Sequence, residues 1–129
     1  VVYNRTAERA TKLAEEFADA HGGHVIAAPL DALADSRADI YVNGTSVGMH
    51  PDVDATPMPT LPDHLGPGVV VFDTIYNPAQ TRLLREAGER GAVSINGVDM
   101  FVRQGAAQFE LWTGRPAPLE VFREVFTRS

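Results

Sequence analysis

Four short stretches of this chain of 129 residues place polar side chains and glycines where they could bind a ligand. They are Asn4-Arg5-Thr6 with Arg9, Asn43 to Gly48, Asp73 to Tyr76, and Asn96 to Met100 with Gln104. Amides, hydroxyls and guanidinium groups hydrogen-bond phosphates and sugars, and glycine lets a backbone approach a ligand closely. These residue types therefore favour binding of a phosphorylated or hydroxylated small molecule.

The stretch Asn4-Arg5-Thr6 with Arg9 bears on whether the chain would bind NAD or a nucleotide with a 2′-phosphate. After the second strand of a dinucleotide-binding fold, NAD-specific proteins usually place an acidic residue that holds the ribose 2′-hydroxyl. Here Arg5 takes that place, between an amide and a hydroxyl, and Arg9 follows one helical turn later. A guanidinium fork with neutral donors suits a 2′-phosphate. The alternative interpretation is a surface arginine beside a helix start that Thr6 caps.

The stretch Gly44-Thr45-Ser46-Val47-Gly48 also matches the G-x-S-x-G pattern of a hydrolase nucleophile elbow. An elbow must run directly into a helix, but Met49-His50-Pro51 leads into a proline-rich segment instead. No histidine follows Asp73, so the expected order of acid and then histidine also fails. The pattern favours a tight, glycine-permitted turn close to a ligand.

Two further stretches carry single candidate side chains. Asp73 follows an apolar run and most simply accepts hydrogen bonds from backbone N–H groups of a turn. Tyr76 could face a ligand or pack on the loop. Met100, Gln104, Gln108 and Leu111 share one stripe of an expected helix, where an amide such as Gln104 usually has a partner. The four histidines show no metal-ligand spacing, so no metal site is expected.

Composition narrows the class of protein. The net charge of −6 argues against a broad nucleic-acid-binding surface, and the absence of cysteine fits a reducing compartment such as the cytoplasm. No apolar stretch approaches the roughly 20 residues that span a membrane, and no signal peptide is visible. We expect no nucleic-acid or membrane partner, and the sequence leaves the oligomeric state open.

Hydrophobic periodicity predicts strands that alternate with helices. Strands are expected at 1–3, 24–28, 39–43, 69–72 and 92–95, helices at 7–20, 79–90, 98–113 and 118–126, and a short helical turn at 30–35. The run 69–72 is fully apolar, as in a strand buried on both faces. The segment 47–68 is rich in proline and predicts a long loop. This alternation predicts a mostly parallel sheet with helices on both faces, in which ligands bind beyond the carboxyl ends of the strands. All four candidate stretches follow such ends.

Together these residues resemble the NADP-binding half of shikimate dehydrogenases. The family pattern N-R-T-x-x-R, N-[AG]-T-S-x-G, D-x-x-Y and G-x-x-M-x-x-x-Q occurs here in order over the whole chain. No single motif is specific, since N-R-T also occurs in glutamyl-tRNA reductases, but the ordered set is. The resemblance implies that Asn4, Arg5, Thr6 and Arg9 bind the NADP 2′-phosphate end. It also implies that Thr45, Ser46, Gly97 and Met100 line the nicotinamide, and that Tyr76 and Gln104 contact shikimate or 3-dehydroshikimate.

Two family elements do not occur in the sequence. No glycine-rich G-x-G-x-x-G turn precedes the N-R-T stretch, so the helix N-terminus that would hold the pyrophosphate is missing. The family's catalytic Lys and Asp are expected in an amino-terminal substrate domain, which is also missing, so no catalytic residue is assigned here. We therefore expect a single partial Rossmann-type domain over 1–129, without its first, central strand. Its helices from about 104 to 129 would pack toward the missing domain.

The resemblance implies an NADP-dependent oxidoreductase of aromatic amino-acid biosynthesis, which interconverts 3-dehydroshikimate and shikimate. One alternative keeps the reaction type but changes the substrate to quinate or another polyol acid. A second alternative is a non-catalytic nucleotide-binding module derived from the same family. Either way, the printed chain is expected to be inactive by itself.

Overall fold

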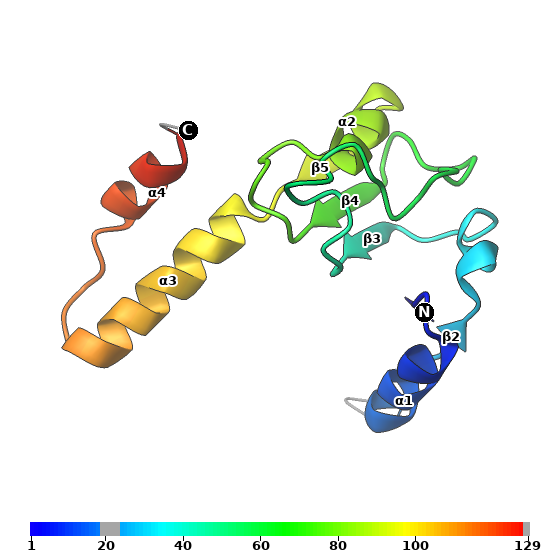
Figure 1. The fold of residues 1–129 in the computed structure, drawn as a ribbon, viewed down its shortest axis with the longest axis horizontal. Coiled ribbons are helices and arrows are strands. Elements are labelled where there is room, and N and C mark those ends of the chain that lie inside the picture. The colour runs from blue at the N-terminus through cyan, green and yellow to red at the C-terminus, as the bar shows by residue number, and fades with distance from the viewer. Residues whose placement is uncertain (19–23, 128–129) are drawn as a thin grey trace. The chain divides into compact units, whose positions relative to one another are not determined.

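A computed structural model of the chain describes residues 1–18 and 24–127 (Figure 1). The chain divides into two compact units. Unit 1 comprises Val1–Arg37 and Thr60–His64, and unit 2 comprises Ala38–Pro59 and Leu65–Ser129. Among the described helices, none is long and apolar enough to cross a membrane. Residues 4–9 lie in unit 1, and the other three candidate stretches lie in unit 2.

The described part of unit 1 contains a short parallel strand pair, one α-helix and one 3-10 helix. Strand β1 (Val2–Tyr3) pairs in parallel with β2 (Ala27–Ala28), and α1 (Ala7–Phe17) connects toward β2. Ala10 and Ala14 are the buried residues of α1, one helical turn apart, so the buried stripe of this helix is narrow. The expected strand at 24–28 is shorter than predicted because only two residues pair with β1. Leu30–Leu33 forms a 3-10 helix in the expected place, and the predicted helical residues 19–20 lie outside the described residues.

Unit 2 contains a three-stranded parallel sheet in the order β3-β4-β5 (Figure 1). Its strands are Ile40–Asn43, Val70–Asp73 and Val93–Ile95, close to the predicted bounds. Asn43 pairs with Asp73 and Phe72 pairs with Ile95, so the three carboxyl ends lie at one edge of the sheet. Helix α2 (Arg82–Glu89) packs on β4 and β5 through Leu83, Leu84 and Ala87.

Helix α2 begins three residues later than the sequence predicts. Thr81 has extended backbone angles, and its hydroxyl accepts a hydrogen bond from Leu84 N at 3.3 Å. This is an N-cap, which fixes the first helical residue at Arg82. Residues 79–80 therefore belong to the preceding turn, although their composition suits a helix.

The two faces of the β3-β4-β5 sheet differ in burial, which corrects one prediction. Val71 is fully buried on the α2 side, but Val70 and Phe72 on the opposite face are only half-buried. Ile40 and Val42 share that face and are 61% and 58% exposed. The run 69–72 is thus not buried on both faces, because within unit 2 the described helix packed on these strands, α2, covers one face only.

Two helices form the end of unit 2. Helix α3 (Val98–Thr113) has the predicted bounds and ends at Gly114, whose φ of +65° is a left-handed cap. Helix α4 (Leu119–Thr127) packs on α3, with Phe109 and Phe122 meeting edge to face at 6.1 Å between ring centroids. The segment between β3 and β4 contains no helix or strand, as its prolines predict.

All three strand ladders of the described residues are parallel, which confirms the predicted α/β class. The ladders form two separate sheets, β1-β2 and β3-β4-β5. In a doubly wound sheet the first strand lies between the second and the fourth. The described strands thus form two sheets, not the one continuous sheet of a complete doubly wound fold.

Candidate functional site

The carboxyl ends of β3 and β4 are joined by a buried hydrogen-bond network centred on Asp73. Its Oδ1 accepts hydrogen bonds from Asn43 Nδ2 at 3.0 Å and Ile75 N at 3.1 Å. Its Oδ2 accepts one from Thr81 Oγ1 at 2.7 Å. Asp73, Asn43 and Thr81 are all almost fully buried. The predicted turn role of Asp73 is confirmed at Ile75, and the carboxylate also ties β3 to the start of α2.

Asn43, which bonds to Asp73, also holds the turn that follows β3 in place. Its Oδ1 accepts hydrogen bonds from Thr45 N at 3.0 Å and from Thr45 Oγ1 at 2.8 Å. The Thr45 hydroxyl in turn accepts one from Val47 N at 3.1 Å. Thr45 therefore uses its hydroxyl inside the turn, whereas Ser46 is exposed and no hydrogen bond of its hydroxyl occurs among the described residues.

Gly48 closes this turn with a backbone that favours glycine. Its φ is +98°, and a Cβ there would lie 3.1 Å from Ala55 O. Met49 N donates to Ser46 O, and the chain then continues into the proline-rich loop without a helix. The predicted glycine-permitted turn is confirmed at Gly48. The nucleophile-elbow alternative is wrong, because an elbow needs a helix directly after its second glycine.

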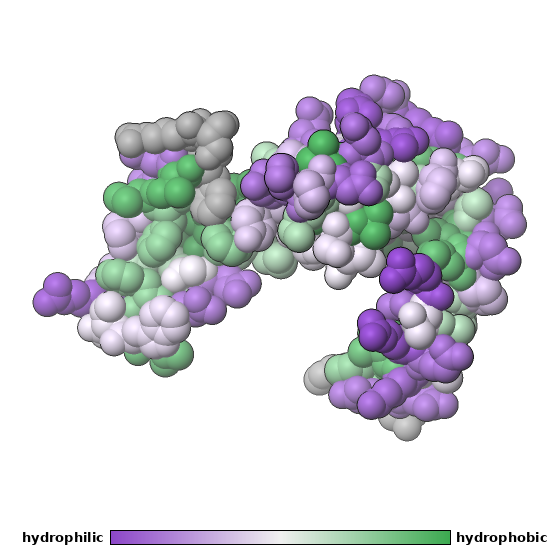
Figure 2. All heavy atoms as spheres, in the orientation of Figure 1, coloured by the Kyte–Doolittle hydropathy of each residue, from purple (hydrophilic) through white to green (hydrophobic). Residues whose placement is uncertain are grey.

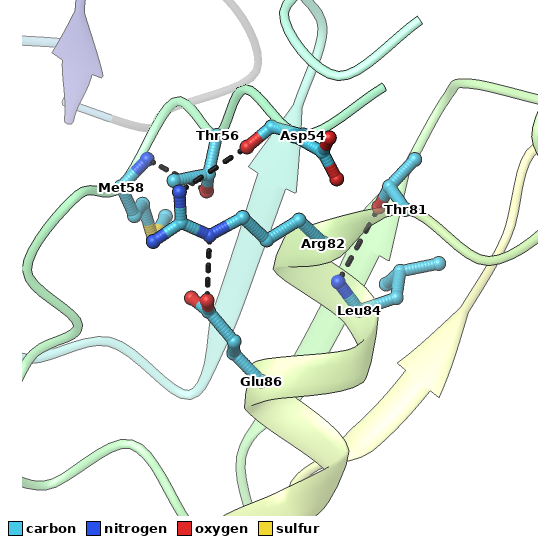
Figure 3. A network of polar contacts seen from close by, with 7 residues as sticks. All are labelled: Asp54, Thr56, Met58, Thr81, Arg82, Leu84 and Glu86. Carbon is cyan, nitrogen blue, oxygen red and sulfur yellow. Dashed lines mark hydrogen bonds and ion pairs between the residues drawn. The ribbon is translucent and has the colours of Figure 1, made fainter.

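The proline-rich loop is fastened to α2 by one arginine (Figure 3). Arg82 Nε contacts Glu86 Oε1 at 2.6 Å, and the same guanidinium donates to the backbone oxygen of Asp54 at 3.1 Å. Figure 3 shows this guanidinium between the loop residues 54–58 and Glu86, while the Thr81 cap lies at the start of the same helix. The loop thus has a fixed attachment near the carboxyl ends of the strands.

Gly97 brings the start of α3 against the segment that follows β4. Its N–H donates to Ile75 O at 3.0 Å. A Cβ on Gly97 would overlap the Thr74 carbonyl group and would lie 2.8 Å from the carbonyl carbon of Ile75. Only glycine allows this approach of two backbones. The stretches 73–76 and 96–100, which the sequence predicts separately, are therefore joined in the structure.

The candidate side chains near this contact, Tyr76, Met100 and Gln104, differ in their exposure and in their partners. Phe101 stacks on Tyr76 with ring centroids 4.2 Å apart, so Tyr76 packs on the helix while about a third of it stays exposed. Met100 is partly exposed and Gln104 is exposed. The expected partner of the Gln104 amide does not occur among the described residues. Five candidate residues of unit 2 follow strand ends as predicted: Thr45, Ser46, Tyr76, Gly97 and Met100. Gln104 lies one helical turn after Met100.

The Asn4–Arg9 stretch lies in unit 1, after β1. Asn4 Oδ1 accepts a hydrogen bond from Thr6 N at 2.9 Å, which shapes the turn into α1. Thr6 occupies the N-cap position, but its hydroxyl makes no capping bond. Arg5, Thr6 and Arg9 are exposed, and their side chains have no hydrogen-bond or ion-pair partner among the described residues. Both interpretations place Arg5 and Arg9 on the surface beside the start of α1, so phosphate binding by these residues stays a prediction.

Three positioning residues were missed or only partly recognised from the sequence: Asn43, Asp73 and Thr81. Each lies at the end of a strand or at the start of a helix, and this position was the one signal in the sequence. Their hydrogen-bond partners lie up to 30 residues away along the chain, so the local sequence did not reveal the contacts. No group of three or more potential metal ligands occurs in the described part of the chain.

The fold and the site together define a class of protein. Parallel strands alternating with helices, with polar residues beyond the carboxyl ends, are the features of doubly wound, Rossmann-type α/β proteins. Residues 97–125 match the family described as the shikimate 5′-dehydrogenase C-terminal domain. Helix α3, with Met100 and Gln104, lies inside this matched range.

Known proteins resemble the chain over nearly its whole length. A shikimate dehydrogenase (NADP(+)) of Methanopyrus kandleri is 46% identical over 128 residues, covering 96% of this chain and 44% of that protein. A crystal structure of shikimate dehydrogenase in complex with NADP+ aligns with a TM-score of 0.85 at 38% identity, over 98% of this chain and 45% of that one. Quinate dehydrogenase from Corynebacterium glutamicum in complex with NAD aligns with a TM-score of 0.82 at 27% identity, over 99% and 45%. The chain belongs to the shikimate dehydrogenase family, and it spans less than half the length of these relatives.

Proposed function

We propose that this chain is the NADP-binding part of a shikimate dehydrogenase. The reaction would be reversible hydride transfer between NADPH and the 3-keto group of 3-dehydroshikimate, which gives shikimate. The observation that carries the proposal is the ordered set of family residues at the carboxyl ends of parallel strands. The similarity of the whole chain to a relative named for this activity supports it. A cytoplasmic location belongs to the same proposal.

The residues of unit 1 fit the phosphate end of NADP. Arg5 and Arg9 are exposed, positively charged and unpaired among the described residues, and the Thr6 hydroxyl is unused. Asn4 contributes by shaping the turn, because its side-chain oxygen holds Thr6 N. Unpaired guanidinium groups with a neighbouring neutral donor suit a 2′-phosphate. In this proposal these four residues select NADP over NAD.

The candidate residues of unit 2 fit the nicotinamide end of NADP, and each would contribute to that site in a different way. Ser46 offers a hydroxyl that has no bond among the described residues, and Gly97 lets the start of α3 lie against residues 74–75, where a side chain has no room. Thr45 holds the turn through its hydroxyl and would line the site beside Met100. When bound, the nicotinamide supplies the hydride acceptor or donor. Tyr76 and Gln104 would contact the substrate.

Catalytic acid–base chemistry is assigned to the part of the protein outside this chain. Asp73 is not a candidate general acid, because both carboxylate oxygens accept hydrogen bonds in a buried network. Lys12, the only lysine of the sequence, is exposed on α1 in unit 1. We therefore assign Asp73 a positioning role.

Exposed apolar residues of α3 and α4 support a contact with the rest of the protein. Leu111 and Trp112 are 82% and 77% exposed, and Val121 and Val125 are also largely exposed. Figure 2 shows hydrophobic side chains gathered over this pair of helices. In this proposal, the helices from about 104 to 129 pack against the substrate domain, which would bury these side chains.

The test is an assay of the whole protein that contains this chain, with NADP+ and either shikimate or quinate. We expect NADPH to form with shikimate, whereas greater turnover with quinate would indicate the alternative substrate. Failure to reduce NADP+ with either acid would favour the non-catalytic module. The 129-residue chain alone is expected to show no turnover. Comparable rates for the two proteins would overturn the assignment of catalysis to the rest of the protein.

A further inference from the structure

Residues 52–58 of the proline-rich loop have one hydrogen bond to a helix or strand within the described part of the chain. Arg82 Nη1 donates this bond to Asp54 O at 3.1 Å. The other hydrogen bonds of the segment are local, such as the one from Ala55 N to Asp52 O at 3.2 Å. The position of the segment relative to α2 therefore depends on Arg82 more than on any other polar group.

The Arg82 guanidinium is itself held in place by Glu86. Its Nε contacts Glu86 Oε1 at 2.6 Å, and the two residues lie one turn apart on α2. Figure 3 shows the guanidinium between Glu86 and the loop, with its free end directed at Asp54. The two side chains are 38% and 26% exposed, and ion pairs at such exposure contribute little stability by themselves. The position that this contact gives to the loop is thus a better explanation for it than the stability it adds.

The loop next to this attachment lies against Gly48, the last residue of the turn that follows β3. A Cβ built on Gly48 would lie 3.1 Å from Ala55 O and 3.8 Å from Thr81 Cβ. Gly48 is buried, so it has no room to move away from these neighbours. Asp54 O and Ala55 O belong to successive peptide groups. Gly48 therefore packs against the stretch of backbone that Arg82 holds.

The turn 45–48 is supported at both of its ends. At its start, Asn43 Oδ1 accepts hydrogen bonds from the backbone N–H and the hydroxyl of Thr45. At its end, Gly48 rests on Ala55. The exposed Ser46 lies between these supports, and its carbonyl oxygen accepts a hydrogen bond from Met49 N at 3.2 Å. The place of the Ser46 hydroxyl thus depends on the loop as well as on β3.

From these contacts we propose that Arg82 is a positioning residue for the nicotinamide end of NADP. It holds residues 54–55 against Gly48 and thereby fixes the turn that carries Thr45 and Ser46. This role rests on the proposed function of that turn. Arg82 acts through the loop and the turn and does not itself contact the cofactor. Its loss should loosen the turn, which lowers affinity for the nicotinamide end and misaligns the hydride transfer.

Hydrogen–deuterium exchange of the whole protein without cofactor tests the structural half of this proposal. Arg82→Met keeps the apolar stem of the side chain but removes its donors. We expect amide exchange about fivefold faster both at Ala55 in the loop and at Met49 after the turn, the scale of one lost hydrogen bond. Arg85→Met is the matched control, because Arg85 is exposed on α2 without an ion-pair partner among the described residues, and it should change neither amide. Faster exchange confined to residues 52–58 would overturn the proposal, since the turn would then not depend on the loop.

Titration of the same variants with two ligands tests the functional half. In the whole protein, Arg82→Met should weaken NADP+ binding about 5- to 10-fold. It should change the affinity for adenosine 2′,5′-bisphosphate, which has no nicotinamide, less than about twofold. The kcat with shikimate should fall about tenfold while KM for shikimate stays unchanged. Arg85→Met should leave all four quantities unchanged.

The outcomes separate this proposal from the proposed function. If the unaltered protein does not bind NADP+, the proposed function fails and the role of Arg82 fails with it. If the unaltered protein binds NADP+ and Arg82→Met binds it equally well, only the role of Arg82 is wrong. Equal losses of affinity for NADP+ and for adenosine 2′,5′-bisphosphate would also overturn that role, because they would indicate a general structural defect.

Discussion

The Asp73 network and the Asn4–Arg9 stretch both follow a strand end, but they use their polar groups in opposite ways. Around Asp73, the carboxylate, the Asn43 amide and the Thr81 hydroxyl are buried and bonded to one another. In the Asn4–Arg9 stretch, both guanidinium groups and the Thr6 hydroxyl are exposed and unpaired among the described residues. Bonded groups hold the backbone in shape, whereas unpaired donors remain available to a ligand. Mutations should therefore cost stability in the first region and affinity in the second.

The largest expected loss of stability follows removal of the Asp73 carboxylate. Asp73→Ala leaves three buried donors, on Asn43, Ile75 and Thr81, without their acceptor. Each unsatisfied group costs about 1–3 kcal/mol by itself, and we expect the free energy of unfolding to fall by roughly 3–5 kcal/mol. Urea denaturation followed by far-UV circular dichroism measures the change. The exposed Asp52→Ala is the control, with an expected change within about 0.5 kcal/mol.

Gly97→Ala is expected to come next. The added methyl group would overlap the Thr74 carbonyl group, so the start of α3 must move away from residues 74–75. Such overpacking costs about 1–3 kcal/mol. Gly105→Ala in the same helix is the matched control, since its Cβ would lie 4.0 Å from Phe122. It should stabilise α3 by about 0.5–1 kcal/mol. Equal melting temperatures for the two variants would show that the approach of Gly97 to Thr74 is not constrained.

Gln104→Ala is expected to have the smallest effect on stability, within about 0.5 kcal/mol, because the side chain is exposed and unpaired among the described residues. As a substrate contact, its loss in the whole protein should raise KM for shikimate about 5- to 10-fold, the scale of one hydrogen bond, and leave NADP+ affinity unchanged. Gln108→Ala, one turn further along α3, should leave KM unchanged. A lower melting temperature with unchanged kinetics would instead make Gln104 a structural residue.

Local signals predicted much of this fold, and long-range contacts explain what they missed. Gly97 and Gly114 bracket α3, so its bounds follow from the sequence. The start of α2 does not, because the capping hydroxyl of Thr81 also donates to Asp73, a contact eight residues back that the local sequence does not reveal. The half-exposed face of β4 could not be predicted from an apolar run, since burial depends on which neighbours are present.

The candidate stretches themselves were visible as residue patterns, and three of them gather at one sheet edge as expected. The sequence alone could not show which of these residues hold the backbone in shape and which face a ligand. Thr45 and Ser46 are adjacent hydroxyl residues, yet the Thr45 hydroxyl bonds to Asn43 and Val47, whereas Ser46 is exposed. That difference arises from the fold of the turn, which brings Asn43 back to Thr45.

The claim that the unpaired donors of unit 1 bind the 2′-phosphate is tested most directly by titrating the whole protein that contains this chain with NADP+ and NAD+. Arg5→Ala should weaken NADP+ binding by about 1.5–3 kcal/mol, or roughly 10- to 150-fold, which is the scale for a hydrogen bond to a charged group. NAD+ binding should change much less, because NAD+ has no 2′-phosphate. The exposed Arg103→Ala on α3 should leave both affinities unchanged. Equal losses of NADP+ and NAD+ affinity in Arg5→Ala would contradict the account and make Arg5 a structural residue.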